Sequence, residues 1–103
     1  MSIRIKIGPQ EHDLAQADSH WIISQIKGQQ NDNCTVCVQV IIEEGDVNLI
    51  LRSSGCPDFG GGSRQANSHE LQILDLWQRH GGKEGRLDGG EVIAFLSQLK
   101  RIL

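Results

Sequence analysis

The sequence contains no tyrosine, and its only aromatic residues are Trp21, Phe59, Trp77 and Phe95. So few aromatic rings leave few surfaces on which nucleic-acid bases could stack. The chain also lacks an excess of basic residues, because ten Lys and Arg stand against thirteen Asp and Glu, for a net charge of −3. A nucleic-acid backbone is recognised through a positively charged surface. We therefore expect that nucleic acid is not a partner.

Long apolar runs are absent as well, although a membrane-spanning helix needs about 20 consecutive apolar residues. The chain begins with alternating apolar and basic residues, from Ile3 to Ile7, instead of the apolar run of a signal peptide. Three cysteines are an odd number, so they cannot all pair within one chain, and free thiols are typical of a reducing compartment. These features predict a cytoplasmic protein without a membrane partner.

What the sequence does contain is a large aliphatic set of 12 Ile, 10 Leu and 5 Val. A chain with this many aliphatic side chains folds instead of remaining disordered. Its 103 residues suffice for one modest hydrophobic core and are too few for two. We expect a single small globular domain over residues 1–103.

The clearest pattern is an alternation of apolar and polar residues over residues 34–43 and 46–53, which predicts a β-hairpin. A two-residue turn at Glu44-Gly45 would set Ile42 opposite Val47 and bring the apolar faces of the two strands together. We expect these faces to be buried; they consist of Cys34, Val36, Val38, Val40 and Ile42 on the first strand and of Val47, Leu49 and Leu51 on the second.

The remaining patterns predict a strand at residues 3–7, a helix at about 10–27, a second helix from 67 or 68 to about 80, and a third from about 89 onward. Asn67 and Glu70 have the spacing of a capping box at the start of the second helix. The order is β-α-β-β-α-α, and we expect an α+β fold with a three-stranded sheet and helices mainly on one face. The first strand would pair with the second, through a right-handed crossover, or with the third.

The second face of the hairpin is not purely polar, because it carries Ile41 and Ile50 beside Arg52, with Glu43 at the acidic end of the hairpin. An apolar patch of this kind is sheltered by a helix or by another subunit. Nothing in the sequence assembles a nucleophile, a base and an orienting group, or a cofactor fingerprint. We therefore expect a protein that is not an enzyme, holds no cofactor and binds another protein or itself, as a homodimer, an adaptor or an immunity-type binder.

A different function is indicated by the glycine-rich loop that precedes the second helix. Backbone N–H groups of Gly60, Gly61 and Gly62, with the guanidinium of Arg64, would form a cradle for an anion or a small molecule at a helix start that also carries His69. The loop lacks the spacing and the Lys-Ser/Thr pair of a phosphate loop, so a flexible connector is the simpler interpretation.

Two cysteines, Cys34 and Cys37, have the two-residue gap that zinc and redox sites use. In a regular strand, however, residues three apart point to opposite faces, so the two thiols would diverge. We therefore expect structural cysteines here and no metal.

The loop between the last two helices resembles the twelve-residue calcium loop of an EF-hand. Gly85 occupies the place of the loop glycine, Glu84 and Asp88 lie at ligand places, and Glu91 stands where the last carboxylate is found. The resemblance implies a helix-loop-helix with weak calcium binding or none, because His80 and Gly82 stand where carboxylates are expected. Helix capping by Asp88 and Glu91 explains the same residues.

Overall fold

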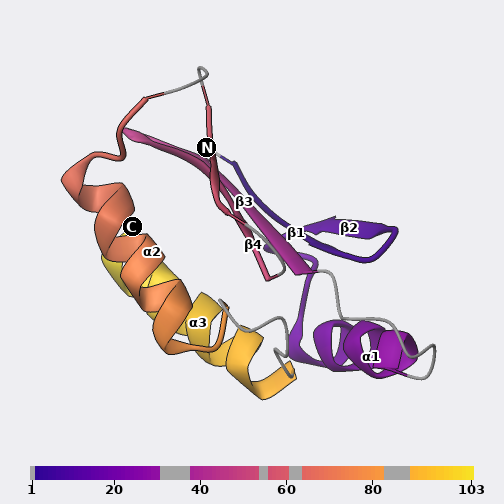
Figure 1. Ribbon diagram of the computed structural model, residues 1–103. Coiled ribbons are helices and arrows are strands. Elements are labelled where there is room, and N and C mark those ends of the chain that lie inside the picture. The colour runs from indigo at the N-terminus through magenta and orange to yellow at the C-terminus, as the bar shows by residue number, and fades with distance from the viewer. Residues whose placement is uncertain (1, 31–37, 54–55, 61–63, 83–88) are drawn as a thin grey trace.

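The computed structural model describes residues 2–30, 38–53, 56–60, 64–82 and 89–103. Within these residues the chain forms five strands and three helices (Figure 1). In chain order they are β1 (Ser2–Ile7), β2 (Gln10–Asp13), α1 (Ser19–Gln30), β3 (Val38–Glu44), β4 (Val47–Arg52), β5 (Asp58–Phe59), α2 (Ser68–Arg79) and α3 (Gly89–Ile102). The α+β class predicted from the sequence is confirmed.

The described strands form one sheet in the order β2-β1-β3-β4-β5, and every neighbouring pair is antiparallel. The predicted three-stranded sheet and the β-α-β-β-α-α order were wrong, because they omit β2 and β5. The first strand does pair with the next long strand, β3. These two strands are antiparallel, so the handedness rule for parallel crossovers does not apply to them.

The first predicted helix, at residues 10–27, is wrong in its first half. Gly8 has a φ of 58°, and the chain reverses at Gly8-Pro9 so that Gln10 lies opposite Ile7. Residues 10–13 therefore pair with β1 as a short edge strand. Their sequence is almost entirely polar, and a polar edge strand carries no apolar alternation by which it could be recognised.

The helix α1 starts later than predicted, at Ser19. The Asp18 side chain accepts a hydrogen bond of 2.8 Å from the backbone N–H of Trp21, which satisfies one of the free donors at the helix start. The ring of Trp21 stacks on that of His12 with centroids 4.3 Å apart, and this contact ties α1 to β2. The helix also ends later than the predicted residue 27, at Gln30.

The hairpin of β3 and β4 is confirmed, but its predicted register is wrong. The turn lies one residue later than predicted, at residues 45–46, so Ile42 lies opposite Leu49 and not Val47. Moving a two-residue turn by one residue changes every pairing by two, which keeps the apolar faces matched in both registers. The turn geometry decides between them, because Gly45 has a φ of 60° and fits the first turn position of a hairpin, where φ is positive.

One face of the sheet, the inner face, is buried against the helices. Its buried side chains are Ile5, Ile7, Val38, Val40, Ile42, Val47, Leu49 and Leu51, and the described part of the predicted hairpin face is therefore confirmed. The helices contribute Ile22 and Ile26 from α1, Ile73 and Trp77 from α2, and Val92, Phe95, Leu96 and Leu99 from α3. The core is aliphatic with two aromatic rings at its centre.

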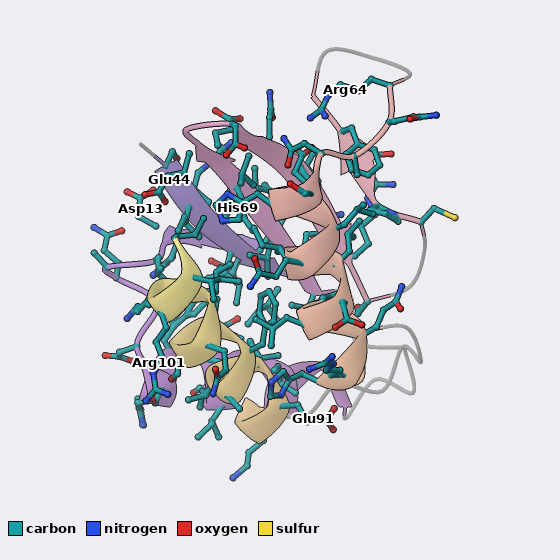
Figure 2. The ribbon with its side chains drawn as sticks, turned by 90° about the vertical axis from the view of Figure 1, so that its left-hand side faces the viewer. Asp13, Glu44, Arg64, His69, Glu91 and Arg101 are labelled. Carbon is teal, nitrogen blue, oxygen red and sulfur yellow. The ribbon has the colours of Figure 1, made fainter. Side chains whose placement is uncertain are left out.

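The helices form a layer on one side of the sheet. Figure 1 shows α2 and α3 side by side along the sheet, and in Figure 2 these two helices lie in front of the sheet. The helix α1 extends the layer, since it contacts α3 and β1. None of the described helices is long and apolar enough to cross a membrane.

Candidate functional site

The second face of the sheet, which we call the outer face, is not covered by any of the described helices. Strand alternation places on it every residue that lies between two inward-pointing side chains. The outer face consists of Glu11 and Asp13 from β2, Arg4 and Lys6 from β1, Gln39, Ile41 and Glu43 from β3, Asn48, Ile50 and Arg52 from β4, and Asp58 from β5.

A single row of paired residues crosses the middle of the outer face. It runs through all five strands in the order Asp13, Arg4, Ile41, Ile50 and Asp58. Directly opposite residues on antiparallel strands have their Cβ atoms about 5 Å apart, so the two isoleucines touch. The centre of the outer face is therefore apolar, with a cation on one side and an anion on the other.

Ion pairs join five of the charged side chains of the outer face. Arg4 Nη1 lies 3.2 Å from Glu11 Oε1, and Arg4 Nη2 lies 3.6 Å from Glu43 Oε1. At the opposite end of the sheet, Arg52 pairs with Asp58. These pairs are exposed and contribute little to stability. The two isoleucines, each partly buried, lie between these two networks of charge.

The four residues predicted as an interface, Ile41, Ile50, Arg52 and Glu43, all lie on the outer face. The corrected register brings the two isoleucines directly opposite each other, which the predicted register would not have done. The sequence did not indicate the flanking residues Arg4, Glu11 and Asp58, because their place depends on how β1, β2 and β5 pair. The pairing of β1 with β3 joins segments distant in sequence, and β2 and β5 are short strands at the two edges of the sheet.

The loop before α2 forms a second polar cluster. The guanidinium of Arg64 makes a bidentate pair with Glu70, with distances of 2.8 Å from Nη1 to Oε1 and 2.7 Å from Nη2 to Oε2. Its remaining N–H groups donate to the backbone carbonyls of Gly60 at 2.9 Å, Gln65 at 3.2 Å and Asn48 at 3.0 Å. All five donors of the side chain are thus directed at acceptors of the protein.

Glu70 is fully buried, and its carboxylate is the centre of this cluster. Besides Arg64, it accepts hydrogen bonds of 3.0 Å each from the backbone N–H groups of Asn48 and Asn67. The hydrogen bonds from Arg64 lower the pKa of Glu70 to about 2, and the two backbone donors act in the same direction against the cost of burial. Asn67 and Glu70 also form the predicted capping box of α2, which is confirmed.

This geometry bears on the predicted anion cradle. Arg64 points to Glu70 and not into an open cleft, and Gly60 contributes its carbonyl to Arg64. Gly61 and Gly62 lie outside the described residues. In the described part of the loop, Arg64 therefore binds the carboxylate of Glu70 in the same chain, which is a structural role.

His69, also predicted at this site, lies between the hairpin turn and the end of α3. Its Nδ1 is 3.1 Å from Asp46 Oδ1, and its Nε2 is 3.1 Å from the backbone carbonyl of Ile102. Both neighbours are acceptors, so only the protonated ring donates to both. The hydrogen bond to Asp46, and then that to Ile102, raises the pKa of His69 above its ordinary value.

We expect the replacement Asp46→Asn to lower the pKa of His69, because it removes the main interaction that favours the charged ring. In the wild-type protein the stabilising contribution of His69 is complete below the unfolded pKa near 6.5 and is lost as pH rises through the higher folded pKa. An NMR titration of the ring protons of His69 in both proteins measures this. An unchanged pKa in the variant would contradict the assignment.

A groove of about 610 Å³ lies between the β1–β2 end of the sheet and α3. It is lined by Ser2, Ile3, Asp13, Leu14, Ala15, Glu44 and Lys100. Figure 2 shows Asp13 and Glu44 close together at this end of the molecule. Because the groove offers both signs of charge beside an apolar floor, it does not select one class of ligand, and the outer face is the stronger candidate.

The described residues contain no group of three or more His, Cys, Asp or Glu that could hold a metal ion. Of the weak calcium candidates, Glu84 and Asp88 lie outside the described residues, and Glu91 lies in the first turn of α3. Cys34 and Cys37, the two cysteines separated by a two-residue gap, also lie outside the described residues. The EF-hand hypothesis and the structural role of these cysteines stay predictions.

Comparisons with protein-family models, with curated proteins and with solved structures returned no match to this chain. The functional argument therefore rests on the geometry of the outer face.

Proposed function

We propose that the protein is a non-enzymatic protein-interaction module whose binding surface is the outer face of the sheet. The observation that carries this proposal is the row Arg4-Ile41-Ile50-Asp58, in which two adjacent isoleucines lie between opposite charges on a face without a helical cover among the described residues. Apolar side chains surrounded by a charged rim are the usual pattern of a protein–protein interface.

The pattern also defines the chemistry of the partner. A complementary surface has an apolar centre to cover Ile41 and Ile50, and it places an acidic group opposite Arg4 and a basic group opposite Asp58. Burial of the isoleucines would supply the affinity, and the flanking charges would orient the partner and speed the encounter.

We propose a cytoplasmic location as well. The odd number of cysteines supports it, as does the exposed free thiol of Cys56, because such a thiol is retained in a reducing compartment. Binding of an anion by the loop at residues 60–64 is the less favoured function, since Arg64 is saturated by acceptors of the chain itself.

The proposal is tested by placing a photo-crosslinking amino acid at Gln39, on the outer face, and separately at Gln72, an exposed position on α2. In cells that produce the protein, we expect protein adducts from position 39 and few from position 72. We further expect Ile50→Asp to reduce the adducts from position 39 at least tenfold, because it puts a charge in the apolar centre.

Thermal unfolding identifies any variant that is not folded. Ile50→Thr keeps the β-branched shape and is the milder alternative to Ile50→Asp. Equal adduct yields from positions 39 and 72, or yields from position 39 that neither substitution at Ile50 reduces, would overturn the proposal.

A further inference from the structure

We infer that the partner of the outer face is a second copy of this chain, packed face to face about a two-fold axis that runs parallel to β3 and β4. This inference rests on the proposed function and adds to it the identity and the orientation of the partner. The axis lies between Ile41 and Ile50, at the centre of the outer face.

The inference follows from the order of residues in the central row. A two-fold rotation about an axis along the strands reverses the order of the strands, so β3 faces β4 of the second copy and β1 faces its β5. Ile41 then meets Ile50 of the other copy, and Arg4 meets Asp58. Because of the two-fold axis, each of these contacts occurs twice. The pattern of charged and apolar residues on the outer face is therefore complementary to the same pattern on a second copy.

The neighbouring rows agree with this arrangement. In the row on one side, Gln39 meets Arg52 of the second copy, and in the row on the other side Glu43 meets Asn48. An amide oxygen can accept from a guanidinium, and an amide N–H can donate to a carboxylate. Donors are thus placed opposite acceptors along the length of both central strands.

A two-fold axis across the strands would give the opposite result. Each strand would then face its own equivalent, with Arg4 against Arg4 and Asp58 against Asp58. Like charges brought together in an interface are unfavourable. The charges therefore select the axis along the strands, which also gives the aligned packing common for two sheets stacked face to face.

The charges that would meet across this interface are already oriented within each chain. Arg4 is held by Glu11 and Glu43, and Asp58 is held by Arg52. A contact between Arg4 and Asp58 would join these pairs into one network across the interface. With the axis between β3 and β4, four strands of each sheet face the other copy and β2 lies outside the overlap. The overlap is about 14 Å across the strands and about 20 Å along them, which is a small interface and implies a weak dimer.

The test is sedimentation equilibrium of the full chain from micromolar to millimolar concentration. We expect the average mass to rise toward twice the monomer mass. We expect Arg4→Asp and Asp58→Arg each to raise the dissociation constant at least tenfold, because each puts like charges opposite each other. Arg79→Asp changes the charge equally on the exposed surface of α2 and is expected to leave the dissociation constant unchanged.

The decisive sample is an equimolar mixture of the Arg4→Asp and Asp58→Arg proteins. In the mixed dimer both reversed charges meet an opposite charge, so we expect dimers to return to within about threefold of the wild-type affinity. Rescue in a mixture cannot arise from contacts within one chain. If Arg4→Asp unfolds, Arg4→Gln replaces it as the single variant, with an expected smaller loss.

A wild-type chain that stays monomeric at millimolar concentration would overturn the inference, and so would a dimer that Arg4→Asp leaves intact or a mixture without rescue. In that case the crosslinking test separates the two proposals. If position 39 still forms adducts that depend on Ile50, but with a protein other than this chain, the proposed function stands and only the identity of the partner is wrong. If those adducts are missing too, both proposals fail.

Discussion

Replacing Glu70 by glutamine is expected to lower the free energy of unfolding at pH 7 by about 3 kcal/mol. Glu70 is fully buried, and its pKa is lowered from 4.5 to about 2, chiefly by the hydrogen bonds from Arg64. A pKa difference of this size between the folded and unfolded chain corresponds to about 3 kcal/mol in favour of the folded state. Glutamine retains the shape and can keep the capping contact to Asn67. Its amide N–H₂ group would face the donors of Arg64 and Asn48, so the expected loss combines the missing charge with lost hydrogen bonds.

The same variant should change the response to acid. The stabilisation by Glu70 is present above its unfolded pKa of 4.5 and is lost as pH falls toward the folded pKa of about 2. Urea unfolding at several pH values between 2 and 7 measures both effects. The matched control is Asp75→Asn on the same helix, which breaks an exposed pair with Arg79 and should cost at most about 0.5 kcal/mol. Equal losses for the two variants would contradict the role assigned to Glu70.

Replacing Phe95 by alanine is expected to cost about 3–5 kcal/mol and to abolish much of the cooperative unfolding transition. Phe95 is fully buried at the centre of α3, and its ring meets the ring of Trp77 edge to face at 4.9 Å. Because the core is close-packed and its neighbours relax only in part, the truncation leaves a cavity beside Trp77.

Thermal or urea unfolding measures this loss. Leu71→Ala on α2 is the control, since Leu71 is 56% exposed and its truncation should change the free energy of unfolding by less than about 0.5 kcal/mol. A Phe95→Ala protein as stable as the Leu71→Ala protein would mean that the contact between α2 and α3 is not part of the core.

The elements that could be predicted are those whose signals are local. The alternation of Val38, Val40 and Ile42 identified a strand with one buried face, because the side chains at every second position of a strand point to the same side of the sheet. The spacing of Asn67 and Glu70 identified the start of α2, because a capping box satisfies backbone donors within a single turn.

The errors have a different cause. The strand β2 carries no apolar alternation, and its pairing partner is set by a reversal at Gly8 and by the stacking of His12 on Trp21. The strand β5 has only two residues and exists because it completes the edge of β4. Such elements owe their conformation to a neighbour and not to their own pattern.

For the candidate site, the sequence identified the apolar residues Ile41 and Ile50 and the charged residues Arg52 and Glu43 of the same hairpin. It did not identify the charges that the other strands contribute, which are Arg4, Glu11 and Asp58. It also indicated Glu70 only as a capping residue, although Glu70 is buried with Arg64. Both omissions concern pairings across a loop or between strands. The spacing of two residues along the chain does not fix such a contact; the path of the backbone between them does.

The sequence by itself determined that this chain has an aliphatic core, a central hairpin and amphipathic helices near its end, because hydrophobic periodicity depends only on the order of neighbouring residues in the chain. Only the tertiary structure decided which face stays open, which strands flank the hairpin and in what order basic, apolar and acidic side chains cross that face. Those properties arise when distant segments pair, and strand pairing is selected by the energy of the whole assembled sheet and not by any one strand.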